Sequence, residues 1–357
     1  MNEKPSRKGK VGQSLDERAG LSVAATEMSF SGPHMGKILG DGYRITRLLG
    51  RGAEGHIYIA QHGSMPERTF VAKVGLMPLK SLEYIDGIPA DPILREAYIL
   101  SHIVGGYFPV FFQSGLTRNG YSFLIREHIV GKTLSELVGR NNPLPLRLVI
   151  GVGAALCEAV ATLHRYRYVH GDVKPQNIVL ADLEKPESLR LVDFGASGPL
   201  HQTPRLILSD ADTEGTPAYM APERTDGVRG ATSADLYSVA SVVYELLAGT
   251  PTLGDFSYDP REAKAYLRSN KPIPCTPLSV KRPELPQELL RTVERGLDRD
   301  PQRRGDWVLG FREALMACQS SVQVSKAADN VNLSTSEDLS TGKLHRWVRR
   351  VSRLWRS

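Results

Sequence analysis

The sequence predicts an α+β protein with two unequal lobes, a small antiparallel-β lobe that contains one helix and a larger, mainly helical lobe. Between residues 43 and 129, short runs rich in β-branched and aromatic residues are separated by Gly, Pro and Asn, a pattern typical of antiparallel strands. One helical segment interrupts these runs, and from about residue 145 the apolar residues recur at helical spacing. A chain of 357 residues is long enough for such a two-lobed domain.

The elements follow in order along the chain. The strand-like runs include YRITRLL at 43–49, HIYIA at 56–60, RTFVAKV at 68–74 and YSFLIREHI at 121–129. The helix of the small lobe is expected to have Asp91 as its N-cap and Pro92 in its first turn, and to run to residue 103. Further helical segments are expected at 146–167, 233–249, 287–298 and 307–318.

The composition divides the chain into five expected segments. A flexible segment, residues 1–42, is rich in Lys, Ser, Gly and Glu and lacks periodicity. The small lobe is expected at 43–129 and the large lobe at 130–318, followed by a polar linker at 319–342. A basic amphipathic helix is expected at 343–357.

Composition also limits the class of protein. The hydrophobic fraction of 41% and the charged fraction of 24% are typical of globular proteins, and the three cysteines show no CxxC spacing, which disfavours zinc and disulfides. We expect a cytoplasmic protein, because no apolar run approaches about 18 residues and no apolar segment follows the basic first residues. The six basic residues of 343–357 account for the net charge of +6, since the rest of the chain has 39 basic and 39 acidic residues. This distribution disfavours a nucleic-acid-binding core.

Two motifs of the small lobe predict phosphate binding. Gly50, Gly52 and Gly55 lie between two strand-like runs, where backbone N–H groups can surround a triphosphate, although a plain turn has the same residues. A strand follows the loop, and this disfavours a dinucleotide-binding fold. Lys73 lies in an apolar strand and needs an anion, unless it is an edge lysine with its ammonium in water. Glu96 is the preferred carboxylate partner of this lysine and Glu83 the second choice.

Two motifs of the large lobe predict metal binding and proton transfer. In HGDVKPQN, residues 170–177, Asp172 and Asn177 are five residues apart before an apolar strand, so both can face one cleft. An aspartate there can accept a hydroxyl proton, and an amide oxygen suits Mg²⁺. Asp193 ends the next apolar run, in LVDFG, and is expected to be a second metal ligand. Either motif alone fits a turn after a strand, but their joint occurrence in this order indicates a site.

These motifs together resemble the eukaryotic-type protein kinases, and most closely the bacterial Ser/Thr kinases, over residues 43–316. The matching positions are 50–55, Ile57, Lys73, Glu96, 170–177, 193–195, 215–223, Asp235 and Arg304. The resemblance implies the two-lobed protein kinase fold and transfer of the ATP γ-phosphoryl group, with Mg²⁺, to Ser or Thr hydroxyls of protein substrates. It implies neither a particular substrate protein nor an oligomeric state.

The resemblance also implies roles for single residues. Lys73 would hold the α- and β-phosphates and pair with Glu96, while Asn177 and Asp193 would bind Mg²⁺. Asp172 would accept the substrate proton, and Lys174 would stabilise the transferring phosphoryl group. The residues expected to contact the nucleotide are Gly50, Gly52, Gly55, Ile57, Val71, Lys73, Glu127, Ile129 and Val179.

Three departures from the family pattern bear on function. Val71 stands where the family usually has alanine, and Arg126 stands before the expected hinge where the family has an apolar residue or threonine. Gly171 replaces the arginine that commonly precedes the catalytic aspartate. That arginine pairs with a phosphate on the activation segment, so we expect activity to depend less on phosphorylation of that segment.

Two alternatives to an active protein kinase remain open. Aminoglycoside and choline kinases also carry HGD with an asparagine five residues later, but they lack the Lys174-Pro175 pair, the DFG sequence and the APE segment present here. A pseudokinase scaffold usually lacks one of the phosphate- or metal-handling residues. Those residues are all present in this chain, namely Lys73, Asp172, Asn177 and Asp193.

The remaining expectations concern regulation and partners. The candidate phosphosites are Thr203, Ser209 and Thr213, which could equally be solvated hydroxyls, whereas Thr216 is expected against Lys174 and Asp172. Glu223 and Arg304 are expected to form a buried ion pair. The helix at 343–357 has an apolar stripe opposite its arginines, which favours an anionic membrane surface over a partner protein or packing within the chain. The stripe consists of Leu344, Trp347, Val348, Val351, Leu354 and Trp355.

Overall fold

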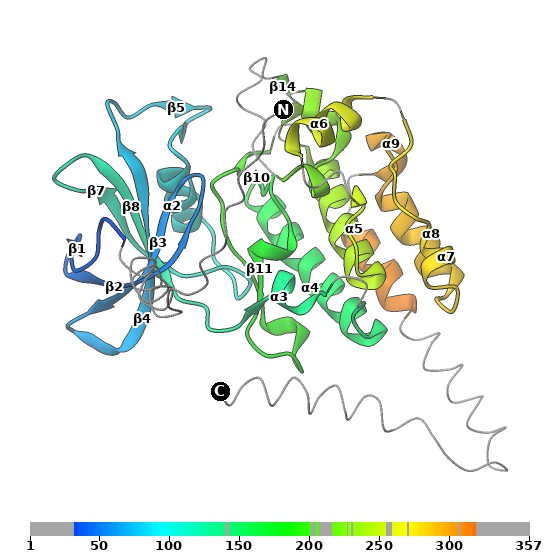
Figure 1. Ribbon diagram of the computed structural model, residues 1–357, viewed down its shortest axis with the longest axis horizontal. Coiled ribbons are helices and arrows are strands. Elements are labelled where there is room, and N and C mark those ends of the chain that lie inside the picture. Colours follow the sequence, from blue (N-terminus) through cyan, green and yellow to red (C-terminus); the bar gives the residue numbers. More distant parts are fainter. Residues whose placement is uncertain are drawn as a thin grey trace, which may run out of the picture.

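The computed structural model describes residues 32–318 with gaps at 140–142, 201–204, 207–215, 227, 230, 255–258, 270 and 306–307. Figure 1 shows the two predicted lobes, a sheet lobe in blue and cyan beside a helical lobe in green to orange. The predicted linker, the predicted basic helix and the three candidate phosphosites lie outside the described residues.

The small lobe is an antiparallel sheet with the strand order β1-β2-β3-β4-β8-β7. Its strands are β1 (Ile38–Leu39), β2 (Tyr43–Arg51), β3 (Gly55–His62), β4 (Met65–Pro78), β7 (Phe111–Leu116) and β8 (Tyr121–Glu127). Residues 70–75 of β4 are all buried, because one face packs on the aromatic cluster of the sheet and the other lies under a helix. Lys73 therefore lies in a strand that is covered on both faces.

The helix of the small lobe is α2 (Pro92–His102), and it begins as predicted. The Asp91 side chain accepts a hydrogen bond from the Leu94 N–H at 2.9 Å, and Pro92 occupies the first turn. Glu96 lies on the buried face of this helix, with a fully buried side chain. The cap thus fixes where the helix begins, and with it the face on which Glu96 lies.

The structure adds three features to the elements named for the small lobe, and the first is strand β7 (Phe111–Leu116). Leu39 is buried and β1 pairs with β2, so the sheet begins within the segment that was predicted to be flexible. A two-residue strand gives too little periodicity to be seen in the sequence. A small hairpin, β5 (Tyr84–Ile85) and β6 (Ile88–Pro89), lies in the stretch before α2 that the sequence left unassigned.

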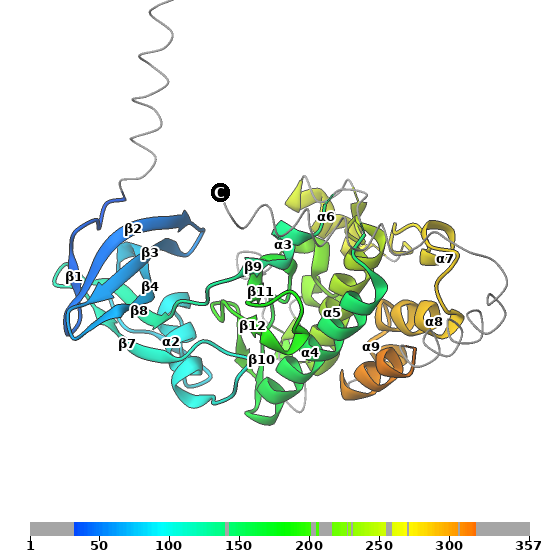
Figure 2. The ribbon, with the colours of Figure 1, turned by 90° about the horizontal axis from the view of Figure 1, so that it is seen from below.

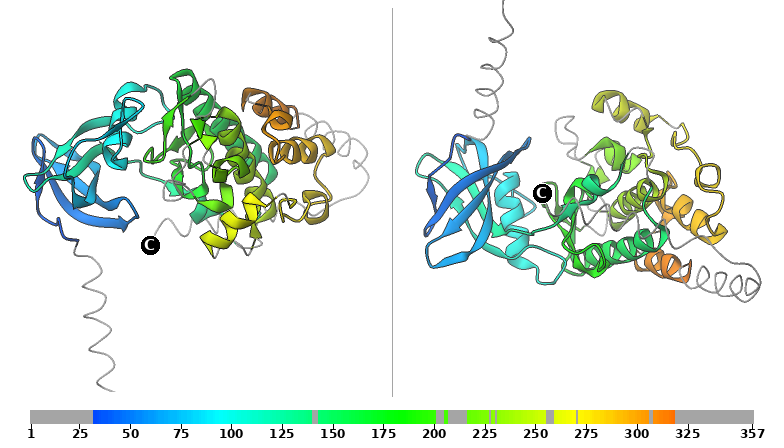
Figure 3. Two further views of the ribbon diagram at one scale, coloured as in Figure 1. Left: turned by 90° about the horizontal axis from the view of Figure 1, so that it is seen from above. Right: turned by 60° about the horizontal axis from the view of Figure 1, so that its bottom comes forward.

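The large lobe is mainly helical. Its helices are α3 (Leu134–Leu137), α4 (Leu146–Arg165), α5 (Thr232–Ala248), α6 (Pro260–Arg268), α7 (Leu278–Lys281), α8 (Gln287–Gly296), α9 (Pro301–Arg304) and a helix at 308–318. Figure 3 shows the gold and orange helices, from α7 onward, at the end of this lobe that is farthest from the sheet. The sequence thus predicted the long helices, and the structure adds short ones.

Helices α4 and α5 form the centre of the large lobe. By length and composition α4 alone among the described helices could cross a membrane, but 67% of its most apolar window is buried within the structure. Every residue of α5 from 233 to 248 is buried, and the helix ends at Gly249, whose φ of 72° is left-handed. One hydrophobic core runs from these helices through Phe194 to Ile93 and Ala97 of α2, and so connects the two lobes.

Short strand pairs frame the two polar loops of the large lobe. β9 (Lys132–Thr133), β11 (Ile178–Leu180) and β12 (Leu189–Leu191) form a three-stranded sheet, and β10 (Tyr168–Val169) pairs with β13 (Gly198–Pro199). Residues 170–177 therefore run from β10 to β11, and residues 192–197 run from β12 to β13. Because both loops end in the same strand pairs, they lie side by side at the boundary of the lobes, where Figure 2 shows β9 to β12.

Candidate active site

The glycine loop joins β2 to β3, and its three glycines have different surroundings. The Gly52 N–H donates to the Gly55 carbonyl at 2.8 Å and closes the turn. A Cβ at Gly55 would lie 2.4 Å from the Val74 carbonyl oxygen, so packing requires this glycine. A Cβ at Gly50 would meet nothing within 4 Å, and one at Gly52 would meet only the Gly55 oxygen at 3.6 Å. The backbone at 50 and 52 is therefore open to the approach of phosphate oxygens.

Lys73 lies at the centre of a buried cluster of charges. Its Nζ is 2.5 Å from Glu96 Oε2, 2.7 Å from Asp193 Oδ1 and 3.9 Å from Glu54 Oε2. The predicted pairing of Lys73 with Glu96 is thus present in the structure. The second-choice partner, Glu83, is exposed on the segment before β5.

The charges of this cluster set its protonation. Burial alone would lower the pKa of Lys73, but the carboxylates of Asp193, Glu96 and Glu54 outweigh burial and hold that pKa above its usual value. Burial alone would raise the pKa of Asp193, but the Lys73 ammonium holds it well below its usual range. Both groups therefore stay charged at neutral pH, and the site presents an ammonium that phosphate oxygens can bind.

The Asp172 carboxylate contacts three neighbouring residues, Lys174, Thr216 and Asn177. Lys174 Nζ is 2.6 Å from Asp172 Oδ2 and donates to Thr216 Oγ1 at 2.9 Å. The Thr216 N–H donates to Asp172 Oδ1 at 3.0 Å, and Asn177 Nδ2 donates to Oδ2 at 3.2 Å. The carboxylate is therefore fixed in orientation, while its side chain remains 14% exposed and open to an incoming hydroxyl group.

The backbone conformation at position 171 requires glycine. Its φ of 78° lies in the left-handed region, and a Cβ there would lie 2.6 Å from the Ala196 carbonyl oxygen. The Gly171 N–H donates to Asp235 Oδ1 at 2.9 Å, and its carbonyl accepts a hydrogen bond from the buried Arg224 guanidinium. The chain thus has no arginine at position 171, but Arg224, from another segment, contacts the backbone of that residue.

A buried aspartate and two packed rings support the loop that carries Asp172. Asp235 Oδ2 accepts the His170 N–H at 2.9 Å and lies 2.8 Å from His164 Nε2. Burial lowers the pKa of His170 despite the nearby carboxylates, so its ring is neutral. That ring packs on Phe194, with the centroids 5.0 Å apart. Asp193 is thereby linked through Phe194 to the loop that carries Asp172.

Asn177 and Asp193, the predicted Mg²⁺ ligands, lie on adjacent loops. The Val192 N–H donates to the Asn177 carbonyl at 2.9 Å, and Asn177 Nδ2 donates to the Asp172 carbonyl at 2.9 Å. This second bond orients the amide so that its side-chain oxygen remains for a cation. No cluster of three His, Cys, Asp or Glu side chains that could hold a metal occurs in the described part of the chain. The two side chains fit a Mg²⁺ ion that arrives with the nucleotide, because Mg²⁺ usually takes few protein ligands and completes its shell with phosphate and water.

The residues predicted around the base come from both lobes. Val71 of β4 is 4% exposed and lies opposite Arg126 in the β4–β8 register, while Phe70 lies opposite Glu127. Ile129 follows β8 in the connection to the large lobe, and Val179 lies in β11. The register places Arg126 at the end of β8, directly before the connection.

Motif matching missed three side chains of the site. Glu54, within the glycine loop, reaches toward Lys73, and Arg224 reaches the carbonyl of Gly171. Arg95 is buried and donates to the Gly195 carbonyl at 2.8 Å, which links α2 to the loop that carries Asp193. An arginine beside Glu96, on a helix whose first two turns are otherwise mainly apolar, was the one signal in the sequence that could have identified Arg95.

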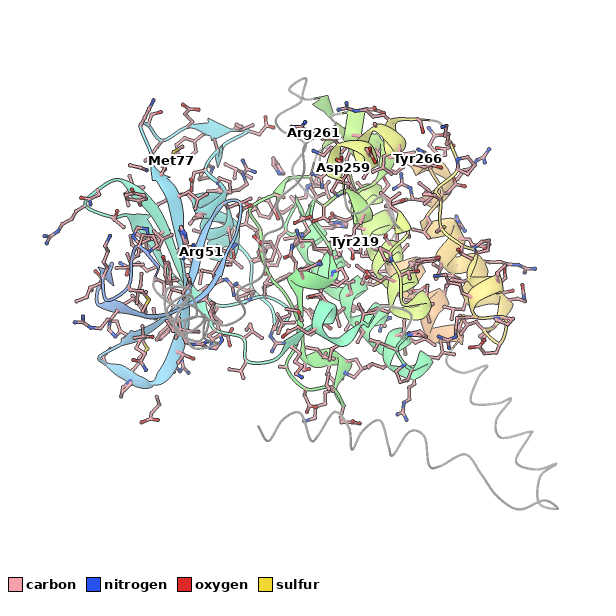
Figure 4. All side chains as sticks on the ribbon, in the orientation of Figure 1. Arg51, Met77, Tyr219, Asp259, Arg261 and Tyr266 are labelled. Atoms are coloured by element: carbon pink, nitrogen blue, oxygen red, sulfur yellow. The ribbon has the colours of Figure 1, made fainter. Side chains whose placement is uncertain are left out.

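A hollow of about 640 Å³ lies on the outer side of α2, away from the catalytic residues. Its lining includes Met77, Leu82, Tyr84, Tyr98 and Leu116. Met77, labelled in Figure 4, lies at this face and is 75% exposed. The hollow includes none of the residues of the charge cluster at the lobe boundary.

Comparison with known proteins agrees with this geometry. The family model described as "Protein kinase domain" matches residues 43–315. Serine/threonine-protein kinase ULK3 of Mus musculus is 33% identical over 277 residues, which are 77% of this chain and 54% of the relative. Serine/threonine-protein kinase PknH of Mycobacterium tuberculosis is 30% identical over 278 residues, which are 76% of this chain and 42% of the relative.

A third relative, the probable serine/threonine-protein kinase PknB of Lactococcus lactis, is 28% identical over 276 residues, which are 76% of this chain and 41% of the relative. The chain thus matches about half the length, or less, of these curated relatives. In each case the similarity covers about three quarters of this chain.

Proposed function

The chain belongs to the protein kinase family, and on that premise we propose that it is an ATP-dependent protein serine/threonine kinase. The observation that carries the proposal is the charge cluster, in which the Lys73 ammonium lies 2.5 Å from Glu96 and 2.7 Å from Asp193. An active kinase needs both this lysine–glutamate pair and the metal-binding aspartate in place. Asp172, on the neighbouring loop, supplies the carboxylate that accepts the proton of the substrate hydroxyl.

In the proposed reaction the substrate hydroxyl oxygen forms a bond to the γ-phosphorus of ATP. The bond from that phosphorus to the β,γ-bridging oxygen breaks, and ADP leaves. Asp172 orients the hydroxyl and accepts its proton, while Lys174, 2.6 Å away, stabilises the negative charge of the transferring group. Mg²⁺ bound at Asn177 and Asp193 would neutralise charge on the phosphate oxygens. Lys73 fixes the α- and β-phosphates.

The contact between Lys174 and Thr216 supports serine or threonine as the acceptor. Thr216 accepts a hydrogen bond from Lys174 at 2.9 Å and donates one to Asp172 at 3.0 Å, so a peptide segment bound against Thr216 would lie close to the carboxylate of Asp172. A short hydroxyl side chain suits that separation better than a long phenol. The names of the relatives point to the same acceptor class.

The test is incorporation of phosphate into protein from γ-labelled ATP with Mg²⁺. The full chain is compared with Asp172→Asn and with a control, Asp182→Asn, whose side chain is 43% exposed. We expect Asp172→Asn to reduce incorporation by at least about a hundredfold, the usual contribution of a positioned general base, and the control to match the native chain. Equal incorporation in all three proteins would favour a pseudokinase scaffold. Label found only on small molecules would favour a small-molecule phosphotransferase.

For residues 343–357 we propose binding to an anionic membrane surface, with a partner protein as the alternative. The proposal rests on the sequence, which places two tryptophans in an apolar stripe among six basic residues. Co-sedimentation with anionic and with neutral liposomes, for the full chain and for residues 1–342, tests it. We expect only the full chain to pellet, and only with anionic liposomes; no difference between the two proteins would refute the proposal.

A further inference from the structure

Each carboxylate oxygen of Glu96 has its own cation. Lys73 Nζ lies 2.5 Å from Oε2, and Arg126 Nε lies 3.2 Å from Oε1, which is within ion-pair distance although the geometry is not that of a hydrogen bond. Glu96 is fully buried, and the Arg126 side chain is 8% exposed. A buried carboxylate of this kind is stable only while its charge is compensated.

The two cations differ in how many other groups they contact. Lys73 is shared among Glu96, Asp193 and Glu54, and in the proposed reaction it also binds phosphate. Arg126 is anchored in the sheet instead, because it lies opposite Val71 in β4 and its Nη1 donates to the Glu127 carbonyl at 3.3 Å. Its contact with Glu96 therefore requires neither nucleotide nor metal.

A second arginine, Arg95 of α2 itself, connects the same helix to the other lobe. Arg95 donates to the Gly195 carbonyl at 2.8 Å, and also to the carbonyls of Pro89 and Ala90 at 3.2 and 2.8 Å. These bonds fix the first turns of α2 beside the metal-binding loop. They do not compensate the charge of Glu96, so that task remains with Lys73 and Arg126.

We propose that Arg126 is a positioning residue that holds Glu96, and with it α2, against the sheet when no nucleotide is bound. The inference rests on the proposed function only in taking the Lys73–Glu96 pair as the reactive arrangement. In the nucleotide-free protein, removal of the Arg126 charge leaves Glu96 Oε1 buried without a cation. Turning toward water then lowers the free energy of the carboxylate, and α2 moves with it.

The experiment measures backbone hydrogen exchange of the full chain without nucleotide. Arg126→Met keeps much of the side-chain volume and removes the charge, whereas Arg126→Lys keeps a cation that can still meet the single oxygen Oε1. The control is Arg68→Met, which removes an exposed arginine of β4. Arg126→Gln provides the same comparison as Arg126→Met with a polar side chain, if the methionine variant does not fold.

We expect Arg126→Met to accelerate exchange in residues 92–102 by about tenfold or more, with β4 and β8 unchanged, because α2 opens as a local unit. Arg126→Lys should stay within about threefold of the native chain, and so should the control. In kinase assays Arg126→Met should lower kcat more than it changes the KM for ATP, since binding energy at the phosphates is retained.

Two results would overturn the proposal. One is native exchange of α2 in both Arg126→Met and Arg126→Gln. The other is acceleration of similar size throughout β4 and β8, which would show that Arg126 only fills space in the sheet. Because exchange is measured without turnover, the proposal can fail while the kinase assay succeeds, and the reverse also holds.

Discussion

Replacement of Gly171 by alanine tests the account of the catalytic loop. The φ of 78° at this residue is unfavourable for any residue with a Cβ, by about 1–2 kcal/mol. The new Cβ would also lie 2.6 Å from the Ala196 carbonyl oxygen and 3.0 Å from Arg224 Nη1. The arginine could move aside, but the carbonyl belongs to the segment that follows Asp193 and can move only with that loop.

The two effects together predict a loss of about 2–5 kcal/mol in the free energy of unfolding, since the enforced contact adds about 1–3 kcal/mol to the backbone cost of about 1–2 kcal/mol. Urea unfolding followed by circular dichroism measures this difference. The control is Gly198→Ala in β13, where a Cβ meets nothing within 4 Å, and its stability should change by less than about 0.5 kcal/mol.

Activity provides a second readout of Gly171→Ala. Because the shifted backbone carries Asp172, kcat should fall by about tenfold or more, as misplacement of a catalytic group usually causes. If Gly171→Ala were as stable and as active as Gly198→Ala, the conclusion that the backbone requires glycine at 171 would be refuted.

Three further predictions follow from the charges of the site and its surroundings. Glu54→Gln should lower the KM for ATP by about two- to fivefold, because the Glu54 carboxylate, 3.9 Å from Lys73, competes with phosphate for this ammonium. Since that side chain is 31% exposed, the competition is worth less than about 1 kcal/mol of binding free energy. An unchanged or higher KM would contradict this prediction. Arg304→Met should lower the free energy of unfolding by about 3–5 kcal/mol, because it breaks the buried 2.6 Å pair with Glu223, whereas Arg303→Met, at a side chain 76% exposed, should have little effect; equal losses in the two variants would refute the role of the pair. A triple alanine variant at the candidate phosphosites should retain its kinase activity, because Gly171 replaces the arginine that would bind a phosphate there, and loss of activity in a folded variant would be the contrary result. Those sites are Thr203, Ser209 and Thr213.

Much of the fold could be predicted because it depends on local patterns. Alternation and turn residues identified the main strands, and helical spacing identified α4, α5 and α8. The start of α2 was predicted because Asp91 and Pro92 give a local capping signal. Strand β1 was missed, since two residues show no periodicity and their burial depends on pairing with β2.

The motifs identified the central residues of the candidate site but not the contacts around them. Lys73 and Glu96 could be paired from the sequence, because a buried lysine needs an anion and the next helix supplies one. The approach of Arg126 to Glu96 and of Arg224 to Gly171 depends on where a strand end and a loop arrive in space. The sequence likewise gave no direct sign of the left-handed backbone at 171, which adds a structural reason for the glycine to its predicted effect on regulation.

The measurement that tests the central proposal most directly is mass-spectrometric mapping of phosphorylated residues after incubation of the chain with Mg²⁺ and ATP. A native sample is compared with Asp172→Asn, each with a generic protein substrate. The account predicts phosphate on serine and threonine in the native sample and almost none in the variant. Phosphate at equal levels in both samples, or on tyrosine alone, would contradict it.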